Sequence, residues 1–226
     1  MGSLLALVLV AAPHKALLTA ALDLEKQGDD AHALERLEHV VSIDPTWDLG
    51  RLELSRLVLK LGVDAERAGW HADVARSLSP ENPRAHYLWA LAQDEAGHHE
   101  AATRALEVSL ALRGDFSDAR LRLAGLLASQ ARWNEAVAQW REYLRAAPTA
   151  TGARLQLALA LEKSGDLKTA ERELRALLSI EAVRVPAARR LIDLLEHSQR
   201  HAEAVSLRRS IEAPGRALRP LKPSAR

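Results

Sequence analysis

The sequence repeats with a period of 34 residues, and this repeat constrains the fold more than any other feature. A first column, at spacings of 34, 35, 34, 34 and 34 residues, holds Gly28, Gly62, Gly97, Ala131, Gly165 and Gln199. A second column is alanine in every copy, at Ala33, Ala68, Ala102, Ala136, Ala170 and Ala204. A third column closes the copies at Pro45, Pro80, Gly114, Pro148, Ala182 and Arg216. Because the columns stay in register, apart from one extra residue between Gly62 and Ala68, they predict six copies of one structural unit.

Each copy has the pattern of two helices joined by a turn. In the fourth copy, two apolar stripes have helical spacing. The stripe before Ala131 consists of Leu123, Ala124 and Leu127, and the stripe after it consists of Ala136, Trp140, Tyr143 and Leu144. Pro148 cannot donate the next backbone hydrogen bond and therefore ends the second helix. The alanine column indicates a position where paired helices approach so closely that a larger side chain would separate them.

This pattern resembles the tetratricopeptide repeat family over residues 14–212. Trp89-Ala90, Gly97, Ala102 and Leu106 follow the family motif, and so do Leu123-Ala124, Ala131, Ala136, Trp140 and Pro148. The sequence departs from the motif where the closing proline is replaced, at Gly114, Ala182 and Arg216, and where leucine replaces the aromatic of the second helix. Pentatricopeptide repeats, which bind RNA, fit a near-neutral chain poorly, and Sel1-like repeats are slightly longer and richer in glycine.

The resemblance implies an all-α fold, a right-handed α-solenoid superhelix of six stacked helix–turn–helix units. The expected units are 14–47, 48–82, 83–116, 117–150, 151–184 and 185–212. One hairpin cannot bury both of its stripes, whereas stacked hairpins share a core, so we expect one elongated solenoid and not two domains. Second helices carry a large apolar residue four positions after the alanine column, at Leu37, Leu106, Trp140 and Leu174. Arg208 takes this place in the sixth copy, which indicates a water-facing end near Glu212.

Both ends of the chain lie outside the repeat. Leu4 to Ala12 is apolar but too short for the ~20 residues of a membrane span. Residues 1–13 could be half a repeat, because Val8 to Pro13 matches Tyr143 to Pro148, or a cloning artefact at Met1-Gly2-Ser3, or the remnant of a secretory signal that lacks a positive first segment. Residues 213–226 carry three prolines, four basic residues and no acid, and are expected to form a tail.

Composition excludes several functional classes. The 226 residues include no cysteine, which removes disulfides, Cys-ligated zinc, iron–sulfur clusters, thiol catalysis and a lipoprotein anchor. The absence of cysteine is equally compatible with the cytoplasm and the periplasm. The formal net charge is +1, which gives no general attraction to nucleic acid or to an anionic membrane. Without the four basic residues of the tail, 27 basic residues face 30 acidic ones, so the repeat region is −3 and the tail +4.

A search for reactive residues gives no catalytic, cofactor-binding or metal-binding site, and we expect a protein that is not an enzyme and needs no cofactor. His98-His99-Glu100 lacks the second histidine of a zincin motif, because Thr103 occupies that place. His197 and His201 lie on either side of the last turn and share no helix face. Asp29-Asp30 is expected to cap the helix that follows it. Trp89 and Trp140 fit core columns, whereas Trp70 is the least constrained tryptophan.

The resemblance also implies a groove lined by the first helix of each unit. Residues off the core stripe of these helices are then expected to contact a partner: Lys15, Leu18, Leu22, Leu49, Leu52, Arg56, Leu59, Arg84, Tyr87, Leu91, Leu121, Arg122, Leu155 and Leu159. Chaperone-binding relatives clamp a C-terminal carboxylate with Lys and Asn, but here Leu18 and Leu22 occupy those positions. The expected groove is therefore apolar with scattered cations, unless its leucines are buried against neighbouring units or the chain's own tail.

These observations favour an adaptor that binds an extended or amphipathic helical segment of a partner protein in the groove. The alternative is a self-associating scaffold of a bacterial envelope or motility assembly, since the composition rich in Ala, Leu and Arg favours a bacterial source with a GC-rich genome. Two further alternatives are a subunit or fragment that regulates an enzyme elsewhere, and contact of the basic tail with nucleic acid.

Overall fold

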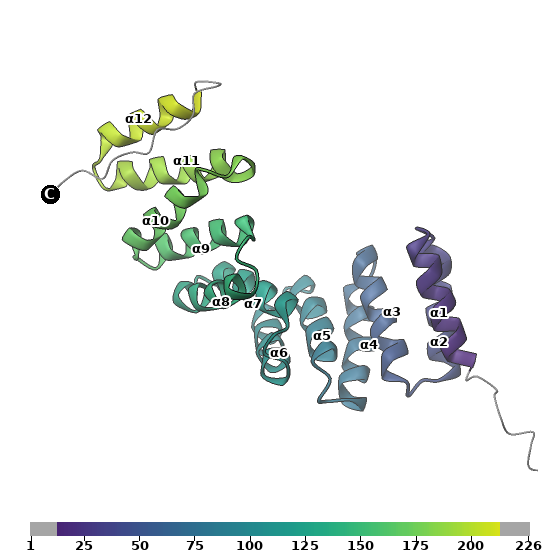
Figure 1. Cartoon of the computed structure of the whole chain (residues 1–226). Helices are drawn as coiled ribbons and strands as arrows, with labels where there is room; N and C mark the ends of the chain where they lie inside the picture. Colours follow the sequence, from purple (N-terminus) through teal and green to yellow (C-terminus); the bar gives the residue numbers. More distant parts are fainter. Residues whose placement is uncertain (1–12, 213–226) are drawn as a thin grey trace, which may run out of the picture. The chain divides into compact units, whose positions relative to one another are not determined.

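The computed structural model describes residues 13–212, which form twelve α-helices and no strand (Figure 1). In chain order they are α1 (Pro13–Lys26), α2 (Asp30–Ile43), α3 (Asp48–Leu61), α4 (Ala65–Leu78), α5 (Pro83–Glu95), α6 (His99–Leu112), α7 (Ser117–Ser129), α8 (Trp133–Ala146), α9 (Thr151–Lys163), α10 (Leu167–Leu177), α11 (Glu181–His197) and α12 (His201–Glu212). Each odd-numbered helix and the next form one hairpin, so the expected all-α repeat of helical hairpins is confirmed. None of the described helices is long and apolar enough to cross a membrane.

The first sequence column marks the turn inside every hairpin. All six of its residues have positive φ, from +58° at Ala131 to +91° at Gly165. At Ala131, the backbone N–H of Arg132 donates to the carbonyl of Leu127 (2.9 Å) and that of Ala131 to the carbonyl of Ala128 (3.1 Å). This left-handed cap satisfies the last carbonyls of a helix, and glycine adopts it without steric cost. The extra residue after Gly62 lies in the α3–α4 turn, where Asp64 caps α4 by accepting from the N–H of Arg67 (2.8 Å).

Replacing Ala131 with glycine should stabilise the protein by about 1 kcal/mol, because alanine at φ +58° is strained and glycine is not. The matched control is Gly165→Ala at the next turn, which should cost a similar amount. The midpoint of urea unfolding measures both changes. If Ala131→Gly leaves the midpoint unchanged or lowers it, the strain assigned to this turn is wrong.

The alanine column lies where the helices approach one another, and all six of its residues are fully buried. Asp29 caps α2 as expected, since its carboxylate accepts from the N–H of His32 (3.3 Å). The turns and the close helix packing were therefore both predictable from small-residue columns.

The contacts divide the chain after Ala119 into two compact bodies. We call described residues 13–119 the N-terminal body and residues 120–212 the C-terminal body. A single stack that runs through all six hairpins, with the unit boundaries expected from the sequence, stays a prediction.

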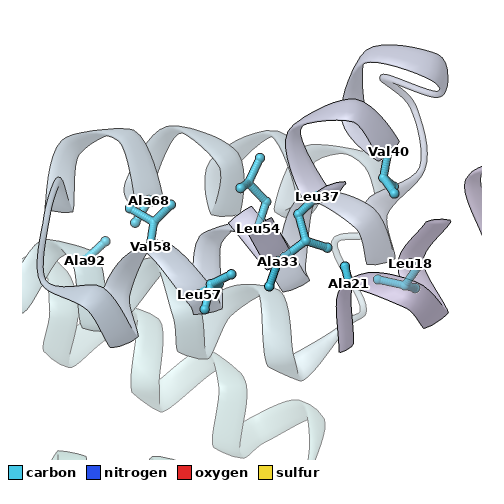
Figure 2. Packing of buried hydrophobic residues seen from close by; sticks show 10 residues of the cluster. All are labelled: Leu18, Ala21, Ala33, Leu37, Val40, Leu54, Leu57, Val58, Ala68 and Ala92. Atoms are coloured by element: carbon cyan, nitrogen blue, oxygen red, sulfur yellow. The ribbon is translucent and has the colours of Figure 1, made fainter. Parts of the chain in front are cut away.

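In the N-terminal body, the core runs along α1–α5 (Figure 2). It includes the fully buried Leu37, Leu57 and Val58, together with the small residues Ala33 and Ala68. A second cluster joins α3, α4 and α5 through Leu52, Ala72, Ala75, Ala85 and Leu88. Neighbouring hairpins thus share core residues, because α2 contacts α3 and α4 contacts α5.

In the C-terminal body, each helix from α9 to α11 contacts the helix that follows it. Its fully buried leucines include Leu161, Leu174, Leu177, Leu191 and Leu195. The sixth hairpin begins with α11 at Glu181, four residues before the expected start of its unit at about residue 185. Pro186 therefore lies in the second turn of α11. Arg208 is exposed on α12 and pairs with Glu196 (2.8 Å), as a water-facing last hairpin requires.

Candidate partner-binding surfaces

Within each body, the first helices of successive hairpins lie side by side. α3 contacts α5 in the N-terminal body, and α9 contacts α11 in the C-terminal body. The residues predicted to meet a partner lie on the first helices, so the structure can show which of them reach a surface.

Two of the predicted contact residues are buried, and the prediction is wrong for them. Leu52 is 1% exposed and packs against Ala72, Ala75 and Leu88. Leu18 is 7% exposed and belongs to the core with Ala21 and Leu37. In both cases the leucine lies on the stripe that faces the neighbouring helices, which was the alternative considered for the groove leucines.

The other predicted residues reach the surface to different degrees. Four of them are half-buried and pack against the core of the N-terminal body: Leu22, Leu59, Tyr87 and Leu91. Two more are half-buried in the C-terminal body, Leu155 and Leu159. Lys15, Leu49, Leu121 and Arg122 are exposed, and Arg56 and Arg84 are half-buried. Their part in binding stays a prediction.

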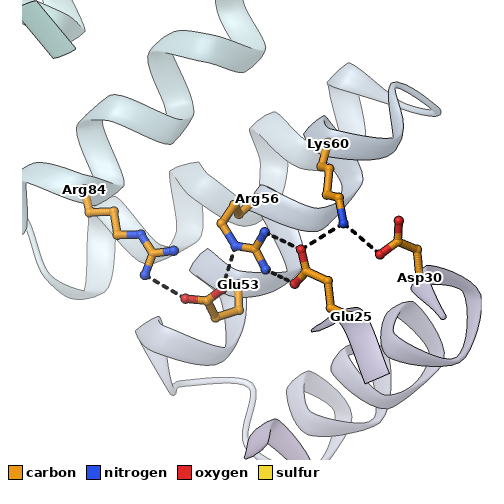
Figure 3. A network of polar contacts seen from close by, with 6 residues as sticks. All are labelled: Glu25, Asp30, Glu53, Arg56, Lys60 and Arg84. Atoms are coloured by element: carbon orange, nitrogen blue, oxygen red, sulfur yellow. Dashed lines mark hydrogen bonds and ion pairs between the residues drawn. The ribbon is translucent and has the colours of Figure 1, made fainter. Parts of the chain in front are cut away.

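In the N-terminal body, the predicted residues Arg56 and Arg84 belong to an ion-pair network (Figure 3). Arg56 binds the carboxylate of Glu25 through Nη1 (2.9 Å) and that of Glu53 through Nε (2.8 Å). Arg84 pairs with the other oxygen of Glu53 (2.7 Å). Lys60 donates to Glu25 (3.1 Å) and Asp30 (2.8 Å). Acids of the same and of adjacent hairpins therefore neutralise Arg56 and Arg84, two of the cations expected in the groove.

The network favours the charged forms of Glu25, Arg56 and Lys60. Hydrogen bonds from Arg56, and then from Lys60, lower the pKa of Glu25 to about 2 despite its partial burial. The same contact with Glu25 raises the pKa of Arg56, and Asp30 and Glu25 raise that of Lys60. These pairs join α1, α3 and α5 across two hairpin junctions, so the network is structural.

Glu25→Gln should destabilise the protein by about 1–2 kcal/mol at neutral pH. The pKa of Glu25 is lower in the folded state than its ordinary value of 4.5, so the stability it gives is complete above pH 4.5 and lost as the pH falls toward 2. The difference between wild type and variant in urea unfolding should therefore shrink between pH 6 and pH 3. A difference that stays constant with pH would show that the Glu25 carboxylate is not held by Arg56.

Sequence reasoning missed the acids of this network, although a signal for them exists. Glu25 and Arg56 are 31 residues apart, and so are Glu53 and Arg84. An acid on one first helix, followed by a base 31 residues later on the next first helix, places the two on adjacent hairpins of a 34-residue repeat. A search at the period alone does not find such pairs.

The C-terminal body has an open hollow of about 450 Å³ between α9 and α11. Its apolar lining includes Leu155 and Leu159 from α9 and Val185 and Pro186 from α11. Val185 is 43% exposed, and the side chain of Pro186 is also at the surface. Leu155 and Leu159 are thus the predicted groove residues that the structure brings together in a hollow.

Two arginines, Arg189 and Arg190, also line this hollow on α11. Both are exposed, and neither forms a hydrogen bond or an ion pair with any residue in the described part of the chain. Asp193 is the acid in the lining. Between residues 13 and 212, no group of three or more His, Asp or Glu side chains could hold a metal ion. The α9–α11 hollow therefore combines an apolar floor with a net positive charge.

No family model matches the sequence, and no curated protein matches it. The structure is similar to that of MamA, with a TM-score of 0.62 and 19% identity over 92% of this chain and 98% of that chain. It is also similar to YrrB, described as a TPR protein with an unusual peptide-binding site, with a TM-score of 0.69 and 16% identity over 76% of this chain and 88% of that one. A tetratricopeptide repeat protein from Parabacteroides merdae gives a TM-score of 0.69 and 18% identity over 90% and 80% of the two chains.

The chain has the tetratricopeptide-repeat fold. The predicted repeat is thereby confirmed at the level of the fold. The low identities carry no residue of these proteins over to this one. In tetratricopeptide-repeat terms, the α9–α11 hollow lies between two successive first helices, where the sequence analysis placed the groove.

Proposed function

We propose that this protein is a non-enzymatic adaptor that binds a segment of a partner protein in the α9–α11 hollow. The observation that supports this most is the apolar floor of Leu155, Leu159, Val185 and Pro186, which lies beside two arginines that have no partner among residues 13–212. Exposed apolar surface with a polar rim is typical of a binding site, and a volume of about 450 Å³ is enough for one or two apolar side chains.

The charges of the hollow define the class of partner. Arg189 and Arg190 favour a carboxylate beside the apolar anchors, because arginine binds carboxylates in a planar, bidentate way. An amphipathic helix with leucines three and four residues apart and glutamates next to them has this chemistry. In the N-terminal body, by contrast, Arg56 and Arg84 are already paired with glutamates.

Two synthetic amphipathic helical peptides test the proposal, one with leucine anchors flanked by glutamates and one with the same anchors flanked by lysines. Fluorescence anisotropy of labelled peptide should show micromolar binding of the acidic peptide to the full chain, and at least about ten-fold weaker binding of the basic one. Higher salt should reduce this difference. Equal affinity for both peptides, or no binding of either, would overturn the proposal.

The second candidate function is self-association as a scaffold. It is favoured by a different surface, the hollow between α4 and α5 that is described next.

A further inference from the structure

The N-terminal body has a hollow of its own, of about 580 Å³, between α4 and α5. Its lining contains Trp70 and Trp89, the carboxylates of Asp64, Glu66 and Asp73, one histidine, and neither arginine nor lysine. Its lining shares no residue with the ion-pair network and has the opposite charge to the lining of the α9–α11 hollow. Acidic and aromatic groups together point to a ligand that is both cationic and rich in flat apolar surface.

One face of α4 forms most of this site. Glu66, Gly69, Trp70 and Asp73 are spaced i, i+3, i+4 and i+7, so they lie in one stripe. Gly69 lies so close to α5 that a Cβ added there would be 3.3 Å from the Cβ of Ala92. The glycine lets the two helices approach. Glu66 and Asp73 are seven residues apart, which places them about 10 Å apart along α4, two helical turns, with Trp70 between them.

The two tryptophans are available at the surface. Trp70 is 58% exposed, and the guanidinium of Arg51, which is itself buried, lies 5.1 Å from the indole centroid. Arg51 therefore backs this indole from the protein side. Trp89 was expected in the core but is only half-buried, and Arg76 lies 4.6 Å from its ring centroid. Both indoles thus have a fixed support and an accessible part.

The negative charge of this hollow is only partly compensated. Asp73 pairs with Arg76, whose Nε donates to it (3.2 Å). Glu66 has no hydrogen-bond or ion-pair partner among residues 13–212, and Asp64 accepts only from the backbone of Arg67. A cationic group of a ligand would gain Glu66 and Asp64 without breaking an internal pair, and it would share Asp73 with Arg76.

The sequence contains one segment with the matching chemistry, the tail of residues 213–226. Its residues follow a three-residue register: Pro214, Ala217, Pro220 and Pro223 form one series, and Arg216, Arg219 and Lys222 form the next. A polyproline II helix has three residues per turn and rises about 3.1 Å per residue, so each series would lie along one edge. Neighbouring cations on the basic edge would then be about 9 Å apart, close to the distance between the two turns that carry Glu66 and Asp73.

We propose that the α4–α5 hollow binds residues 213–226 of a second copy of this chain in the polyproline II conformation. The proline edge packs on Trp70 and Trp89, and the basic edge faces Glu66 and Asp73. Pro-rich segments bind aromatic-lined grooves in this way, because the extended helix has little entropy to lose. The tail and the hollow are different parts of the chain, so a bound pair of copies leaves one tail and one hollow free, and association continues from chain to chain.

Light scattering of the full chain between about 10 and 500 μM tests this proposal, since a single short segment binds with an affinity in this range. The mean mass of the wild type should rise steadily with concentration. Trp70→Ala and the tail variant Arg219→Glu/Lys222→Glu should both remain monomeric to at least ten-fold higher concentration. The matched control is Val63→Ala, an exposed apolar residue in the turn before α4, which should associate like the wild type.

Mixing the Trp70→Ala variant with the tail variant provides the sharpest result. Trp70→Ala keeps a working tail and the tail variant keeps a working hollow, so an equimolar mixture should form dimers and nothing larger. A synthetic peptide of residues 213–226 should dissolve the wild-type assemblies, whereas a scrambled peptide of the same composition should not. A monomeric wild type, association of Trp70→Ala at wild-type concentrations, a mixture that fails to pair, or an equally effective scrambled peptide would each overturn the proposal.

Discussion

Ala102→Phe is expected to unfold the third hairpin and to lower the stability of the whole N-terminal body by about 3–5 kcal/mol. Ala102 is fully buried on α6, next to the fully buried Leu106 and Thr103 at 2% exposure. No volume is available there for a phenyl ring, so α6 would have to move away from its neighbours. Because α5 and α6 pack on each other, the displacement exposes core surface of the whole hairpin.

The matched control is Ala111→Phe on the exposed face of the same helix, which should change stability by less than about 0.5 kcal/mol. Urea unfolding followed by circular dichroism measures both variants. If Ala102→Phe and Ala111→Phe had equal midpoints, the alanine column would not be the contact that sets the distance between paired helices.

Leu155→Glu/Leu159→Glu is expected to abolish binding of the acidic amphipathic peptide, with a loss of affinity of at least 30-fold. The two substitutions remove the α9 part of the apolar floor and place two carboxylates where the peptide would bring its own. Both leucines are only half-buried, so helicity should remain close to that of the wild type. Leu167→Glu, an exposed leucine on α10 outside the hollow, is the control and should bind normally.

A comparison with Leu52→Glu separates loss of binding from loss of folding. Leu52 was predicted to meet a partner but is buried, so a glutamate there should unfold the N-terminal body by leaving a charge without a partner in the core. Retained binding by the Leu155→Glu/Leu159→Glu variant would show that the α9–α11 hollow is not the site.

The sequence predicted the features that repeat, and missed those that depend on neighbouring hairpins. The turn at Ala131 and the burial of Ala102 follow from columns, because the same backbone conformation and the same close contact recur in every copy. Leu18 and Leu52 were misplaced because a helix with leucines on several faces does not show which stripe faces its neighbours.

The candidate sites were less predictable than the fold. The pair of Glu53 and Arg84 joins two hairpins at a spacing that differs from the period, so it leaves no column. The α9–α11 hollow contains Leu159, which was predicted, and Arg190, which was not, because Arg190 lies on a helix that begins earlier than the period indicates.

The most direct test of the adaptor function reverses the charge of the α9–α11 hollow. The wild type and Arg189→Glu/Arg190→Glu are each titrated with the glutamate-flanked and the lysine-flanked peptide, and the four affinities are compared. The wild type should prefer the acidic peptide by at least about ten-fold, and the variant should prefer the basic one. If both proteins show the same preference, the two arginines do not face the partner and the proposed site is wrong.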